Sequence, residues 1–152
     1  MLRRRQVRQA LGLGDREGRY SLYTDGATEQ NYLRGVQFAD ATGKVRFTSV
    51  FPACYRGRWP HVHFEVYQNQ AGITDAGQAI ATCQLALPEN VCDTVYAQAG
   101  YEASAPNLSP VTLAGDMVFG NDDGVRQLAA VTGDVSRGYT VSLAVRIDPG
   151  TK

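Results

Sequence analysis

The chain has 152 residues, the length of one ordinary domain, and its 15 basic side chains balance 15 acidic ones. A chain without net charge has no overall field to attract nucleic acid or an anionic membrane, and no apolar run approaches the roughly 20 residues that span a bilayer, so we expect neither partner. The three cysteines form no CxxC pair, and their odd number gives no basis for a disulfide framework.

The N-terminal segment, MLRRRQVRQALGLG, has four arginines among its first eight residues. Its apolar stretch is too short for the core of a secretory signal, and no small-residue cleavage site follows. We assign residues 1–14 to a basic tail, either disordered or the remnant of a signal, and residues 15–152 to one domain. We expect a cytoplasmic protein, with export through a twin-arginine-like N-terminus as the alternative.

Alternation of apolar and polar residues with a period of two predicts half-buried strands along the domain. Gly, Asn, Asp and Pro separate these segments, and a turn is expected at residues 40–44. One short helix is predicted after Pro88, with Glu89 in its first turn and Gly100 at its end. The pattern favours an all-β fold, an antiparallel β-sandwich with one short helix. The predicted strands are residues 32–39, 44–51, 61–67, 80–87, 116–120, 126–134 and 140–147.

Both histidines of the chain lie in the segment HVHFEVY, residues 61–67. In a strand, Val62, Phe64 and Val66 would face the core, while His61, His63, Glu65 and Tyr67 would share the other face. One interpretation is a polar, solvent-facing strand surface. The other is a metal site, in which Glu65 would complete a zinc centre with the two imidazoles.

Tyr55 stands six residues before His61, and the turn-prone sequence RGRWP separates the two. A phenol has a pKa near 10 and binds a metal only when deprotonated, which favours a strongly Lewis-acidic ion. A tyrosine beside two histidines is therefore more typical of Fe(III) than of softer metals.

Residues 32–67 resemble the core of the intradiol ring-cleavage dioxygenases, especially proteins similar to the protocatechuate 3,4-dioxygenase β-chain. That family has a tyrosine in a PxxY turn followed by R-x-P-H-x-H-F. The matching residues here are Pro52, Tyr55, Arg58, Pro60, His61, His63 and Phe64. Upstream, DREGRYS matches the family's D-x-x-G-x-Y-S segment and places Tyr20 at its tyrosine, and downstream ATCQL places Gln84 at the position of an active-site glutamine.

The resemblance implies a prealbumin-like β-sandwich holding one Fe(III), with Tyr20, Tyr55, His61 and His63 as ligands. It implies a catechol-type substrate and O2, and cleavage of the ring between its two hydroxylated carbons to a cis,cis-muconate-type product. Tyr55 would be the displaceable ligand that takes a substrate proton, and Arg58 and Gln84 would stabilise the negative charge that develops. The catalytic residues implied are therefore Tyr55, Arg58 and Gln84.

The chain departs from the family before Asp15, where it resembles a member shortened at the N-terminus. A lost edge strand would leave backbone groups open to pairing, so a homo-oligomer is one expected outcome. Two alternatives stay open. The chain could be a non-catalytic prealbumin-like or carbohydrate-binding β-sandwich, because fold alone does not fix function, or an inactive dioxygenase with a decayed N-terminus.

Overall fold

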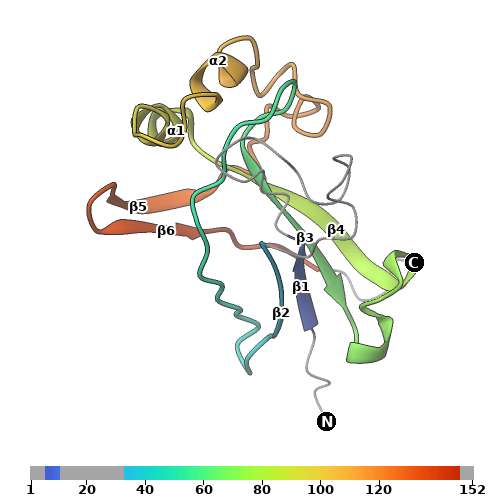
Figure 1. Ribbon diagram of the computed structural model, residues 1–152. Coiled ribbons are helices and arrows are strands. Elements are labelled where there is room, and N and C mark those ends of the chain that lie inside the picture. Colours follow the sequence, from blue (N-terminus) through green and yellow to red (C-terminus); the bar gives the residue numbers. More distant parts are fainter. Residues whose placement is uncertain (1–5, 11–32, 148–152) are drawn as a thin grey trace.

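The architecture was obtained as a computed structural model that describes residues 6–10 and 33–147 (Figure 1). Its main sheet has four antiparallel strands in the order β2-β1-β3-β4. Their bounds are Gln6–Ala10 for β1, Arg34–Phe38 for β2, His61–Tyr67 for β3 and Ala79–Ala86 for β4. A separate hairpin joins β5, Ala130–Asp134, to β6, Gly138–Ser142. The described chain is therefore an all-β fold with short helices.

The helices gather at one end of the molecule (Figure 1). They are α1, Glu89–Tyr96, and α2, Ser104–Leu108, while two 3-10 turns, Gln70–Gly72 and Ala76–Gln78, connect β3 to β4. The predicted helix after Pro88 is present, with Glu89 in its first turn. Its predicted end at Gly100 is wrong, because α1 ends at Tyr96, and the single predicted helix is joined by α2.

The hydrophobic core lies where this helical end meets the ends of β3 and β4. Trp59, Leu87, Val95 and Phe119 are buried there together with Tyr96, and partly buried residues of β6 pack against them. The Phe51 ring links α1 to β6, because its centroid lies 6.1 Å from that of the Tyr96 ring and 5.8 Å from that of the Tyr139 ring. Burial of this cluster fixes the segment before β3 between the sheet and the helices.

Three predicted strands are found close to their expected positions, as β2, β3 and β4. The predicted strand at 44–51 is wrong, because residues 45–51 enter neither sheet of the described structure. The predicted strand at 116–120 is also wrong. The Asp116 carboxylate accepts hydrogen bonds from the backbone N–H groups of Val118 and Phe119, which closes a tight turn instead. The last two strands are shorter than predicted, as β5 and β6.

The N-terminal assignment needs one correction. Residues 6–10 lie within the predicted tail, but they form β1, which pairs with both β2 and β3. A position between two strands satisfies the backbone donors and acceptors on both sides of β1, and a free tail could not do this. Residues 1–5 and 11–32, including Tyr20, lie outside the described residues. In the described part of the chain, no helix is long and apolar enough to cross a membrane.

Candidate active site

The turn from Tyr55 to Arg58 brings two of the predicted site residues together. Arg58 donates its backbone N–H to the Tyr55 carbonyl at 3.4 Å, and Gly57 has a φ of 83°. A glycine with positive φ at the third position is what a type II turn requires. The two side chains at the ends of this turn then meet, since Arg58 Nη1 lies 3.4 Å from Tyr55 Oη.

Polar side chains of the helical end hold the backbone just before this turn. The Tyr96 hydroxyl donates to the Pro52 carbonyl at 2.9 Å, and the Tyr101 hydroxyl donates to the Phe51 carbonyl at 2.8 Å. The backbone N–H of Cys54 donates to Ser104 Oγ at 3.1 Å, and the Asn107 amide donates to the Cys54 carbonyl at 2.9 Å. In the part of the chain that the structure describes, no strand pairs with residues 51–54, so these contacts provide hydrogen-bond partners for their backbone groups.

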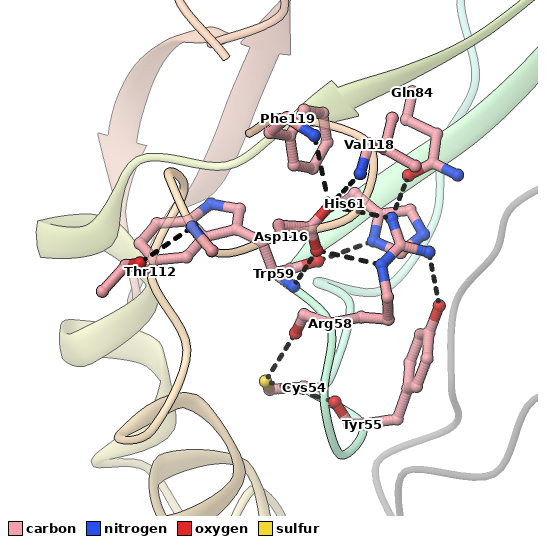
Figure 2. Close-up of polar contacts among 11 residues, drawn as sticks. Cys54, Tyr55, Arg58, Trp59, His61, Gln84, Thr112, Asp116, Val118 and Phe119 are labelled. Atoms are coloured by element: carbon pink, nitrogen blue, oxygen red, sulfur yellow. Dashed lines mark hydrogen bonds and ion pairs between the residues drawn. The ribbon is translucent and has the colours of Figure 1, made fainter. Parts of the chain in front are cut away.

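A buried carboxylate, Asp116, anchors the other end of the turn (Figure 2). Its Oδ2 accepts from Arg58 Nε at 2.9 Å and from the Trp59 backbone N–H at 2.8 Å. Its Oδ1 accepts from Arg58 Nη2 at 3.3 Å and from the Val118 and Phe119 N–H groups at 2.8 and 3.3 Å. Burial raises the pKa of Asp116, but the hydrogen bonds from Arg58 and the two nearest backbone N–H groups outweigh it, so the pKa lies below its usual value.

Arg58 connects Asp116 to the sheet through Gln84. Arg58 Nη2 donates to Gln84 Oε1 at 2.6 Å. Gln84 lies on β4 directly opposite His63 of β3 in the antiparallel register. Directly opposed residues project to the same face, so the register places Gln84 on the face of the two histidines. Tyr55, Arg58 and Gln84 thus form one hydrogen-bonded group (Figure 2), and Gln84 lies beside His63.

His61 is only 3% exposed, so the prediction of a solvent-facing strand surface is wrong at this position. Its Nδ1 lies 2.6 Å from the Trp59 carbonyl oxygen, an acceptor only, which makes Nδ1 the protonated nitrogen. Burial lowers the pKa of His61 to about 4, so the ring is neutral near pH 7. Its Nε2 therefore has a free lone pair and no hydrogen-bond partner within the described ranges.

This arrangement at His61 fits a metal ligand. A ligating histidine usually donates its second ring N–H to a carbonyl or carboxylate, which fixes the tautomer and the ring orientation. The Tyr55 ring lies 5.8 Å from the His61 ring, edge to face, so a phenol and an imidazole are neighbours. Burial raises the pKa of Tyr55 and the Arg58 charge works against that rise. Imidazole and phenolate donors are the set that suits a ferric ion.

His63, one strand period beyond His61, is partly exposed. Its Nε2 lies 3.6 Å from Glu65 Oε1, too far for a hydrogen bond, while Glu65 Oε2 accepts from the Tyr67 hydroxyl at 2.7 Å. No group of three or more His, Cys, Asp or Glu side chains in residues 33–147 could hold a metal ion. The zinc centre of His61, His63 and Glu65 is therefore not supported, and a metal at the two histidines would need other ligands such as tyrosine.

The structure thus brings together five of the predicted site residues, namely Tyr55, Arg58, His61, His63 and Gln84. Tyr20, the sixth, lies outside the described residues. Sequence reasoning missed Asp116, which it placed on a strand. A charged Arg58 in a partly buried turn requires a counter-charge, and an aspartate that caps its own following residues is a recognisable turn signal, so DMVFG held a usable clue.

Comparison with known proteins adds a structural likeness. No protein-family model matches the chain, and no curated protein matches its sequence. Among solved structures, an intradiol ring-cleavage dioxygenase from Tetranychus urticae is similar with a TM-score of 0.77 and 20% identity, over 98% of this chain and 73% of that one. A second solved dioxygenase structure matches with a TM-score of 0.77, 19% identity and the same coverage of both chains. The chain therefore has the fold of the intradiol ring-cleavage dioxygenases.

Proposed function

We propose that this protein is a non-haem Fe(III) dioxygenase that cleaves a catechol-type ring between its two hydroxylated carbons, incorporating both atoms of O2 to give a cis,cis-muconate-type diacid. The observation that carries the proposal is the group of Tyr55, Arg58 and Gln84 beside a buried histidine with a free Nε2. A binding module has no need of a neutral, tautomer-fixed histidine next to a phenol and a guanidinium. We also infer that the two sheets pack as a prealbumin-like β-sandwich.

The residues that would hold the ion are Tyr20, Tyr55, His61 and His63. When bound, the ferric ion would withdraw electron density from the catecholate and make the ring reactive toward dioxygen. His61 is ready for this role because its Nδ1–H is committed to the Trp59 carbonyl. Tyr20 enters the proposal through the family resemblance alone.

Tyr55 would take a proton from a catechol hydroxyl. Its Oη lies 3.4 Å from Arg58 Nη1, and the Arg58 charge opposes the rise that burial causes in the pKa of Tyr55. A base must lie within hydrogen-bond reach of the proton it removes, and the Tyr55 hydroxyl is in the same group as the residues that would face the substrate.

Arg58 and Gln84 would stabilise the negative charge on the substrate oxygens as the ring loses its aromaticity. The guanidinium has five N–H donors. Nε–H and one Nη2–H meet Asp116, the other Nη2–H meets Gln84, and one Nη1–H meets Tyr55. One Nη1–H therefore has no partner in the described structure and is available to a substrate oxygen. Donors fixed before the reaction begins stabilise developing charge without reorganisation.

The experiment is iron analysis of the purified protein combined with oxygen uptake on a panel of catechols. We expect one ferric ion per chain, visible colour from tyrosinate-to-iron charge transfer, and uptake with at least one catechol. Tyr20→Phe and His63→Ala should each lose iron, whereas Gln84→Ala should keep iron and turn over more slowly. Gln37→Ala, at an exposed residue of β2, is the matched control and should change neither property.

Two outcomes would contradict the proposal. A colourless protein that stays iron-free after reconstitution would favour the non-catalytic β-sandwich. A protein that binds iron but takes up no oxygen with any catechol would favour an inactive dioxygenase. Equal iron content in all the variants would contradict the ligand assignment.

A further inference from the structure

The Asp116 carboxylate is fully enclosed by donors. Its side chain has no exposed surface, and five N–H groups point at its two oxygens. A carboxylate offers about four lone-pair positions, so no position is left for a metal or a proton. Asp116 can therefore be neither a ligand nor a general base, and its function must be exerted through the groups it holds.

We propose that Asp116 is the positioning residue of the site: its carboxylate fixes the Arg58 guanidinium so that Nη1 faces Tyr55 and the second N–H of Nη2 faces Gln84. The catalytic consequence rests on the function proposed above, whereas the hold on Arg58 does not. Nε and Nη2 of Arg58 lie 2.9 and 3.3 Å from the two carboxylate oxygens, a bidentate contact. Such a contact fixes the plane and the rotation of the guanidinium as well as its position.

The carboxylate also ties the arginine to the strand that holds the histidines. Asp116 Oδ2 accepts from the Trp59 N–H, and the Trp59 carbonyl in turn accepts from His61 Nδ1. On its other side, Asp116 Oδ1 holds the N–H of Phe119, whose ring lies 6.3 Å from the His61 ring. One side chain thus sets the Arg58 position relative to His61 through two routes (Figure 2).

A simpler interpretation gives Asp116 only the task of closing the 116–119 turn. The backbone contacts to Val118 and Phe119 would be enough for that task. They do not account for the two further contacts that Asp116 makes to the guanidinium of Arg58, which is 58 residues away in the sequence. The two interpretations differ in what happens to Arg58 when the charge of Asp116 is removed but its shape is kept.

The first test uses the metal-free wild-type protein. Hydrogen exchange at the arginine side-chain Nε–H groups is measured by NMR, with the Arg58 signal identified by its loss in Arg58→Lys. We expect the Arg58 Nε–H to be protected relative to that of Arg126, whose side chain is 89% exposed and whose Nε is 3.8 Å from Asp122 Oδ2. Equal exchange at Arg58 and Arg126 would overturn the proposal without any variant of Asp116.

The second test compares Asp116→Asn with Asp123→Asn. Asp123 is an exposed residue of the following loop, so its variant has the same change of charge without a contact to Arg58. In Asp116→Asn we expect the Arg58 Nε–H to lose its protection while the β3 and β4 backbone amides keep theirs. We also expect unchanged iron content and a kcat lower by on the order of 10- to 100-fold, the scale of a small misplacement of a catalytic group. Asp123→Asn should match wild type throughout.

The outcomes separate this proposal from the proposed function. A folded Asp116→Asn with wild-type Arg58 protection and wild-type kcat overturns the positioning role. Loss of β3 and β4 amide protection together with that of Arg58 overturns it in favour of a purely structural role. If wild type binds no iron and takes up no oxygen, the proposed function fails, and the NMR comparison still decides whether Asp116 holds Arg58.

Discussion

Two turns of this protein each contain a glycine with nearly the same positive φ but are stabilised in different ways. Gly43 and Gly57 have φ values of 81° and 83°, and a Cβ at either position would meet nothing within 4 Å. The turn at 40–44 is stabilised locally, because Asp40 Oδ1 accepts from Thr42 and Lys44, two and four residues away. The turn at 55–58 is held by Asp116, 58 residues further on.

The comparison of the two turns shows where long-range contacts are needed in this fold. The exposed turn at 40–44 only has to reverse the chain, and its own aspartate is sufficient. The turn at 55–58 must aim two side chains, Tyr55 and Arg58, at one another and at the sheet. Contacts that are distant in sequence cost more entropy to form, and here they coincide with the candidate site. Substitutions in the two turns should therefore have unequal effects on stability and on activity.

The largest difference is expected between the two aspartates. Asp116→Ala would leave the Arg58 charge partly buried without its partner, and three backbone N–H groups without an acceptor. Removing one member of a buried pair costs roughly 3–5 kcal/mol of the free energy of unfolding. Asp40→Ala, with its contacts exposed to water, should cost much less. Urea denaturation of both variants measures the difference, and similar losses would contradict it.

The stabilising role of Asp116 should also be visible in how the free energy of unfolding depends on pH. The pKa of Asp116 is lowered in the folded state, so its stabilising contribution is complete above the ordinary aspartate value of about 3.9 and is lost as pH falls through the lower folded value. The wild-type free energy of unfolding should therefore decrease in acid. In Asp116→Ala, part of this decrease should be absent. An identical acid profile in wild type and variant would show that Asp116 does not titrate with folding.

The same distinction between local and distant contacts explains how much of the fold was predictable from the sequence. Alternation is a local property, and it predicted β2, β3 and β4 close to their observed bounds. It failed at 44–51, where Val45 and Phe47 are half-buried but the backbone joins neither sheet of the described structure. Alternation indicates which side chains are buried, but it does not show whether the backbone pairs with a neighbouring strand.

In the candidate site, too, local neighbours could be predicted from the sequence and distant ones could not. His61 and His63 are neighbours by strand period, and the turn residues 56–57 bring Tyr55 back to Arg58, so their proximity could be predicted. Their roles stay predictions. Asp116 could not be connected to Arg58 from the sequence, because nothing local links residues so far apart. A buried charge only indicates that some partner exists.

The third prediction concerns the two glycines. Alanine at φ near 80° is strained by about 1–2 kcal/mol, and since both positions are open, Gly43→Ala and Gly57→Ala should lose similar stability. Only Gly57→Ala should also slow oxygen uptake, because a shift of this turn moves Tyr55 away from Arg58. Denaturation and kcat measured on both variants test this. An equal loss of kcat, or none in either, would show that the 55–58 turn has no special role.

The smallest effect is expected from the contacts that hold the segment before this turn. Tyr96→Phe removes the buried hydrogen bond to the Pro52 carbonyl and should lower the free energy of unfolding by about 1 kcal/mol. Tyr139→Phe is the matched control, because its ring also packs on Phe51 but its hydroxyl makes no hydrogen bond within residues 33–147, and its cost should stay within about 0.5 kcal/mol. Thermal and urea unfolding measure both. If Tyr139→Phe costs as much as Tyr96→Phe, the segment before the turn is held by ring packing and not by its backbone hydrogen bonds. Of the long-range polar contacts, only those made by Asp116 would then stabilise this region.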